Sequence, residues 1–161
     1  MTVLIEIIIG CAVFGVFAIW NTARDPLAVI SDYPPAIRQR CRELGLIENT
    51  EKHYSTKDYV RKGIAMILFA GIFAFVLSKI NGIHSFKEGF LVSYLIWLAI
   101  AWFDALVIDS LWFTHSPKVR IPGTEDMKEY GDCMFHIEQS AIGSLLGLPV
   151  CLLTGLIASV L

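Results

Sequence analysis

Residues 90–113 read FLVSYLIWLAIAWFDALVIDSLWF, an apolar run interrupted by two aspartates, Asp104 and Asp109. A helix needs about 20 such residues to cross the hydrocarbon core of a bilayer, and this run is long enough. Burying a charged side chain in such a helix costs about 2.5 to 3.5 kcal/mol on insertion scales. The run therefore predicts a membrane span, and it raises the question of what the two carboxylates do.

Three further apolar runs extend this prediction to the whole chain. They cover residues 3–20, 63–80 and 141–161. Of the 161 residues, 55% are hydrophobic and only 17% are charged, and the mean hydropathy is +0.62. A soluble domain of this length would be far more polar. We expect an all-α, polytopic membrane protein with four spans that form a single membrane domain over residues 1–161.

The distribution of Lys and Arg predicts the orientation. Segment 21–62 carries eight of these residues and segment 114–140 carries three, whereas the opposite side has only Lys79 and Lys87. Basic residues accumulate on the cytoplasmic side of membrane proteins. Both segments are therefore expected in the cytoplasm and both termini outside, in a plasma (inner) membrane.

A short amphipathic helix is expected within the first cytoplasmic segment, in DYPPAIRQRCRELGLI at residues 32–47. Pro34 and Pro35 suit the first turn of a helix, and Gly45 suits its end. Its apolar positions recur at helical spacing: Ile37, Cys41 and Leu44. Residues 34–45 could lie on the inner leaflet and contact anionic lipids, or pack against the cytoplasmic ends of the spans.

The second cytoplasmic segment begins with a compact basic loop, THSPKVRIPGTED at residues 114–126. Its His, Lys and Arg side chains suit contact with a lipid phosphate, although an ordinary turn between two spans would carry them as well. Residues 114–126 and 34–45 are thus the two expected contacts with anionic lipid.

Small residues recur every four positions along the last apolar run. They are Gly143, Gly147, Cys151, Gly155 and Ser159. Such a ridge lets a neighbouring helix backbone approach closely, which is a main source of helix association in lipid. It predicts a helix interface, either inside the bundle or between the subunits of a homo-oligomer.

Acidic side chains within the spans are the first candidates for function. Asp104 and Asp109 lie about 140° apart around a straight α-helix, so different roles are expected for them. Asp104 should face protein or water, as a hydrogen-bonding group or as a functional one. Near the outer side, Glu6 is expected to form an ion pair with Lys79, and proton handling is the alternative interpretation of this residue.

A second group of candidates lies near the cytoplasmic membrane surface. If the last helix begins at Thr124, Asp132 and His136 are one turn apart on it. With Asp109 they could hold a divalent metal, which is the one cofactor that the sequence suggests. Asp104, Asp109 and His115 could instead bind a ligand or handle protons. A solvated polar face is the third interpretation.

These candidates leave three functions open. The first is binding or transport of an ion or small ligand through the acidic and histidine cluster. The second is a metal-dependent enzyme acting on a lipid headgroup. The third is a structural or regulatory subunit of a membrane complex. No zinc-finger, nucleotide-binding or hydrolase motif occurs in the sequence, and no nucleic-acid partner is expected.

Two stretches, WFDALVIDSLWFTHSPKVRIPGTEDM at 102–127 and DYPPAIRQR at 32–40, carry a resemblance. In them the chain resembles a group of small, uncharacterised bacterial inner-membrane proteins with four spans. The resemblance covers most of the chain and implies a bacterial plasma membrane. It implies no activity and no site residues, because none is established for that group.

Overall fold

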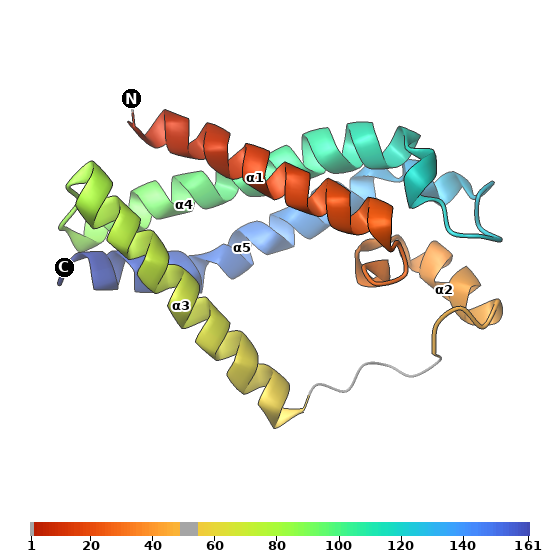
Figure 1. Cartoon of the computed structure of the whole chain (residues 1–161), viewed down its shortest axis with the longest axis horizontal. Helices are drawn as coiled ribbons and strands as arrows, with labels where there is room; N and C mark the ends of the chain where they lie inside the picture. Colours follow the sequence, from red (N-terminus) through yellow and green to blue (C-terminus); the bar gives the residue numbers. More distant parts are fainter. Residues whose placement is uncertain (1, 49–54) are drawn as a thin grey trace. The chain divides into compact units, whose positions relative to one another are not determined.

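The chain is helical along nearly all of its described length. The computed structural model describes residues 2–48 and 55–161. Its elements are α1 (Thr2–Arg24), η1 (Ile30–Asp32), α2 (Pro35–Glu43), α3 (Thr56–Asn81), α4 (Phe86–Phe103), η2 (Asp104–Phe113), η3 (Pro117–Val119), η4 (Lys128–Gly131) and α5 (Cys133–Ala158) (Figure 1). No strand occurs in these two ranges, so the all-α prediction is confirmed.

Four segments within the described ranges are long and apolar enough to cross a membrane. They are Thr2–Arg24, Tyr59–Asn81, Phe86–Phe113 and Cys133–Ala158. Many large apolar side chains on them are exposed, for example Val16 at 71% and Leu146 at 68%, as expected for helices that face lipid. The chain is a multi-pass helical membrane protein.

The start of the last helix was predicted wrongly. It begins at Cys133 and not at Thr124, because the preceding residues form a separate turn. Gly123 adopts a left-handed φ of 84°, and the Thr124 hydroxyl hydrogen-bonds the Tyr130 hydroxyl at 2.7 Å. Asp132 then starts α5, since its Oδ1 accepts a hydrogen bond from the backbone N–H of Phe135.

The described residues group into two compact units. Unit 1 comprises Met1–Gly10, Lys52–Ala101 and Ile142–Leu161, and unit 2 comprises Cys11–Glu51 and Trp102–Ala141. Unit 1 consists of long apolar helix segments. Unit 2 contains the short elements and the loops between them as well as helix segments. The polar stretch ENTEKHYST at residues 48–56 also predicts an exposed loop, and most of this stretch lies outside the described residues.

In unit 1, glycines allow α4 and α5 to pack backbone to backbone. A Cβ added at Gly155 would lie 2.7 Å from the carbonyl oxygen of Phe86 and 2.8 Å from the backbone nitrogen of Phe90. A Cβ added at Gly147 would collide with the ring of Trp97. The middle of the small-residue ridge therefore faces a helix of the same chain.

The two ends of the ridge differ from its middle. A Cβ added at Gly143 would meet nothing within 4 Å, although the Gly143 carbonyl accepts a hydrogen bond from Trp97 Nε1 at 3.1 Å. Ser159 is exposed, and its hydroxyl bonds the carbonyl of Leu156 in its own helix. Neither end of the ridge is closely packed against another helix of unit 1, whereas the middle of the ridge is.

In unit 2, α2 packs its apolar face into a small core. The core residues are Tyr33, Ile37, Cys41, Phe113, Val119, Ile121 and Tyr130. The Tyr33 hydroxyl donates to the carbonyl of Val119 at 2.9 Å, and the Tyr130 hydroxyl accepts from the backbone N–H of Ile121 at 3.0 Å. Ile37 and Cys41 are therefore covered by protein, which favours the packed arrangement over one that lies on the leaflet, although Leu44 at the end of the helix is 40% exposed.

Burial in this core changes the chemistry of two side chains. It raises the pKa of the Cys41 thiol, which keeps the thiol protonated and unreactive. Burial, followed by the nearby Tyr130, Cys41 and Asp32, raises the pKa of Tyr33 well above the ordinary tyrosine value, and Arg120 opposes this. Tyr33 is thus a neutral hydrogen-bond donor in the folded protein.

We predict that Gly155→Ala destabilises the protein by about 1 to 3 kcal/mol, because two backbone atoms of α4 would have to move. The measurement is the thermal unfolding temperature of the purified protein in detergent. Gly71→Ala in α3 is the matched control, since its Cβ would meet nothing within 4 Å. Alanine is the better helix former, so this control should be neutral or stabilising. Equal losses for both variants would contradict the packing of α4 on α5.

We also predict that alkaline pH destabilises unit 2 through Tyr33. Its folded pKa is raised, so its contribution is present below the unfolded pKa of about 10 and is lost as the pH rises through the folded value. Tyr33→Phe should lower stability at neutral pH by about 1 kcal/mol, the loss of one hydrogen bond, and should reduce the further alkaline loss. Thermal unfolding over a pH series measures both effects. Tyr59→Phe, at an exposed position, should leave the alkaline loss unchanged.

Candidate functional site

The candidate site is built on η2, a π-helix that continues α4 from Asp104 to Phe113. The backbone N–H and the hydroxyl of Thr114 both donate to the carbonyl of Asp109, five residues earlier. In the same register, the Ser110 hydroxyl donates to the carbonyl of Ala105 at 2.6 Å. Side-chain hydrogen bonds thus support the wider helical turn. π-Helical turns are rare in proteins, and those that occur often lie at functional sites.

The π-helix changes the relation between its two aspartates. Bonds from residue i to residue i+5 bring residues five apart close to one face, whereas an α-helix separates them by about 140°. The expectation of different roles for Asp104 and Asp109 assumed a straight α-helix, and it stays a prediction.

Asp109 is paired with a buried histidine from α5. Nδ1 of His136 lies 3.2 Å from Oδ2 of Asp109, with the two side chains 5% and 20% exposed. An ionised carboxylate only accepts, so this contact places a proton on Nδ1. The rings of Phe113 and Phe135 pack edge-on against the imidazole, each with its centroid at 5.1 Å.

The other ring nitrogen of His136 is the most informative atom of the site. Nε2 is buried and has no hydrogen-bond partner among the described residues. With Nδ1–H directed to a carboxylate, neutral His136 presents the Nε2 lone pair as a base or a ligand. Asp109 orients the ring in the way that a carboxylate orients a catalytic or metal-binding imidazole.

Two sequence candidates lie apart from this pair. Asp132 is exposed, and its carboxylate is engaged in capping α5. His115 is also exposed, and its Nδ1 donates to the carbonyl of Leu111 at 2.8 Å. The structure thus pairs Asp109 with His136, but adds neither Asp132 nor His115 to this pair.

The described residues include no group of three or more His, Cys, Asp or Glu side chains that could hold a metal ion. The divalent-metal hypothesis relied on Asp132, which would have been one turn before His136 if the helix had started earlier. Asp109 and His136 remain as two potential ligands. The metal interpretation would require a third protein ligand at this site.

Glu6 has a different neighbour from the one expected. Oε2 of Glu6 accepts a hydrogen bond from Nδ2 of Asn81 at 3.0 Å, whereas Lys79 is exposed. Both Glu6 and Asn81 belong to unit 1. Sequence reasoning missed Asn81, although its position at the end of the second span was a usable signal, because an amide there matches the depth of Glu6.

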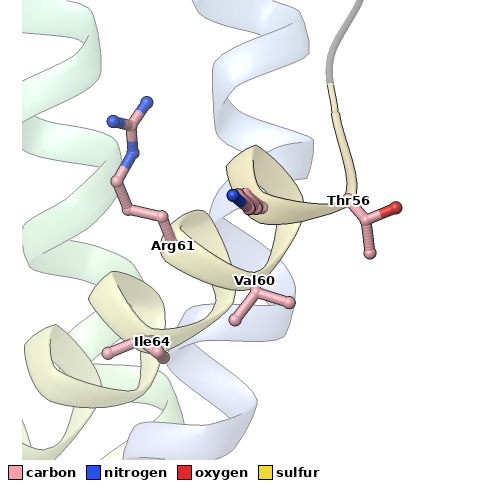
Figure 2. Close-up of a pocket in the computed structure, with 5 residues that line it drawn as sticks. Thr56, Val60, Arg61 and Ile64 are labelled. Carbon is pink, nitrogen blue, oxygen red and sulfur yellow. The ribbon is translucent and has the colours of Figure 1, made fainter.

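Two surface hollows offer no alternative site. One is lined by Thr56, Lys57, Val60, Arg61 and Ile64, and Figure 2 shows the labelled side chains projecting from successive turns of α3. The other is lined by Ala12, Val13, Val16, Phe17 and Trp20 of α1. Each involves a single helix and contains no carboxylate or histidine. Neither is a cleft suited to an organic substrate.

No protein-family model, no curated protein and no solved structure matches the chain. The chemistry of the site is therefore inferred from its own residues. Those residues are a carboxylate–histidine pair, with the carboxylate inside one span and the histidine at the start of another, and a second carboxylate five residues earlier on η2.

We predict an energetic coupling between Asp109 and His136. Thermal unfolding of Asp109→Asn, His136→Gln and the double variant should give an interaction free energy of about 0.5 to 3 kcal/mol, because each single change leaves a buried polar partner. The same cycle between Asp132→Asn and His136→Gln is the matched control. It should be additive, since Asp132 caps the helix and does not pair with His136. Additivity in both cycles would contradict the pair.

Proposed function

We propose that this membrane protein binds and moves protons, and that Asp109 and His136 are the groups that take them up and release them. The observation that carries the proposal is the buried His136 ring, with Nδ1 3.2 Å from Asp109 and Nε2 without a partner among the described residues. Histidine is the side chain whose charge ordinarily changes near neutral pH. Ionisable groups inside membrane spans typically mark proton or ion pathways.

The second carboxylate supports a role in transfer. Asp104 precedes Asp109 by five residues on η2, and a π-helical turn brings residues five apart closer around the helix axis than an α-helix does. Two carboxylates on one face repel each other when both are ionised, so the pair favours a state with one shared proton. A proton on Asp104 and a proton on the Asp109–His136 pair are thus alternative states of one cluster.

The proposal favours a proton over a larger ion or an organic ligand. The described residues offer two metal ligands at this site and no third, and the two hollows contain no acid or histidine. A lipid-headgroup enzyme would need that third ligand as well as a cleft. Proton exchange needs only hydrogen-bonded groups and access to water.

Sidedness and lipid contact are part of the proposal. The eleven Lys and Arg residues of segments 21–62 and 114–140 favour a cytoplasmic position for both. The basic side chains of residues 34–45 and 114–126 would then face anionic headgroups of a bacterial plasma membrane, as the resemblance to small inner-membrane proteins also suggests. Assembly as a homo-oligomer would supply the surfaces that four spans alone do not enclose.

The test is proton flux into proteoliposomes. Purified protein is reconstituted with a pH-sensitive dye inside the vesicles, and a potassium gradient with valinomycin supplies the driving potential. We expect a flux well above that of protein-free vesicles for the wild type. Asp109→Asn and His136→Gln should reduce it to the protein-free level, because each removes one member of the pair.

His115→Gln is the matched control for this assay, since His115 is exposed and lies apart from the cluster. It should keep the wild-type flux. Equal reconstitution of all variants is checked by density-gradient flotation. Wild-type flux equal to that of empty vesicles, or full flux in both pair variants, would contradict the proposal.

A further inference from the structure

A second polar cluster lies in unit 1, between the start of α1 and the end of α3. Asn81 Nδ2 donates to Glu6 Oε2 at 3.0 Å, which satisfies one oxygen of the carboxylate and one end of the amide. The other end of each group is also buried. A carboxylate within an apolar span requires a partner that offsets its charge.

Three buried oxygen atoms of this region have no hydrogen-bond partner among the described residues. They are Glu6 Oε1, Asn81 Oδ1 and Ser78 Oγ. Ser78 is only 3% exposed and precedes Asn81 by three residues, so the two lie on one face of α3. Leaving a buried polar atom unsatisfied costs about 1 to 3 kcal/mol, so three such atoms in one region need an explanation.

The chemistry of these atoms defines what would satisfy them. A carboxylate oxygen and an amide carbonyl oxygen only accept hydrogen bonds, and a hydroxyl oxygen can accept one as well. An added donor or a positive charge would satisfy all three. Oxygen-only ligands of this kind suit a proton or a small hard cation.

Nearby charges do not supply this positive charge. The charged and titratable groups at this end of unit 1 are Lys79, His84, Lys87 and Glu88. All four are exposed, and among the described residues none forms an ion pair with Glu6.

We infer that Glu6, Asn81 and Ser78 form a binding site for one small cation with oxygen ligands, separate from the Asp109–His136 pair. The occupant is either a proton on Glu6 Oε1, which would donate to Asn81 Oδ1, or a monovalent metal ion held by the three oxygens. In both cases one positive charge neutralises Glu6 and gives Asn81 Oδ1 a partner, and the metal ion would contact Ser78 Oγ as well. The inference does not depend on proton movement at Asp109 and His136.

The experiment measures thermal unfolding of the purified full-length protein in detergent. Wild type and Glu6→Gln are compared in choline, potassium, sodium and lithium chloride at constant ionic strength, and at neutral and mildly acidic pH. One of these conditions should raise the unfolding temperature of the wild type by a few degrees. Glu6→Gln should lose that response, because its uncharged amide can donate to Asn81 Oδ1 without a cation.

The two occupants give different results. A metal ion would produce a saturable rise in the unfolding temperature of wild type with one of the alkali cations. A proton would produce a rise on acidification, with no difference between the salts, that is larger in wild type than in Glu6→Gln. Glu88→Gln, at an exposed position on α4, is the matched control and should respond as wild type does.

A wild type and a Glu6→Gln variant that respond equally to every salt and to acid would overturn the inference. If Glu6→Gln does not fold, Asn81→Ala takes its place, since it keeps the carboxylate and removes the amide oxygen that both occupants contact. It should then show a weaker response than wild type. An unchanged response of Asn81→Ala would overturn the inference in the same way.

Discussion

A carboxylate inside a membrane helix persists only where another group shares its charge or where a proton removes it. In this chain the contact between Asp109 and His136 meets that condition. It ties η2 to the start of α5 within unit 2, and it sets the tautomer of a buried imidazole. The unpartnered Nε2 atom of the buried ring and the proposed proton chemistry both follow from this contact.

The local helix geometry serves the same contact. Hydrogen bonds from Ser110 and Thr114 to carbonyls five residues earlier support the π-turns that carry Asp109. The rings of Phe113 and Phe135 pack edge-on against the His136 imidazole. Further along unit 2, the buried Tyr33 and Tyr130 hydroxyls fix the turn that precedes α5. Packing and polar contacts together position one imidazole ring.

Unit 1 shows how apolar helices associate when water does not drive them together. Gly155 and Gly147 remove the side chains that would separate α5 from α4. The ridge of small residues visible in the sequence is thus occupied by a helix of the same chain along its middle. A surface for a second subunit would have to lie elsewhere on the spans, for example on the exposed apolar side chains of α1.

The fold was largely predictable from the sequence, because span length and apolar composition are properties of the residues themselves. The short helix between Pro35 and Gly45 was predictable for the same reason, since proline and glycine limit the backbone directly. The site was predictable only in part. Asp109 and His136 were singled out, but the π-helix depends on side-chain bonds of Ser110 and Thr114 that no periodicity reveals. The start of α5 follows a turn closed by the bond between Thr124 and Tyr130, which no periodicity reveals. Asn81 was missed as the partner of Glu6, although its depth at the end of the second span was a usable signal.

The most direct test of the account is solid-state NMR of His136 in lipid bilayers, with histidine labelled with nitrogen-15 and aspartate labelled with carbon-13 at the carboxyl group. Signals are assigned by their loss in His136→Gln and in Asp109→Asn. The account predicts a dipolar coupling between the Asp109 carboxyl carbon and His136 Nδ1, and a neutral imidazole with its proton on Nδ1 and none on Nε2. A neutral ring with its proton on Nε2, or the absence of that coupling, would contradict it.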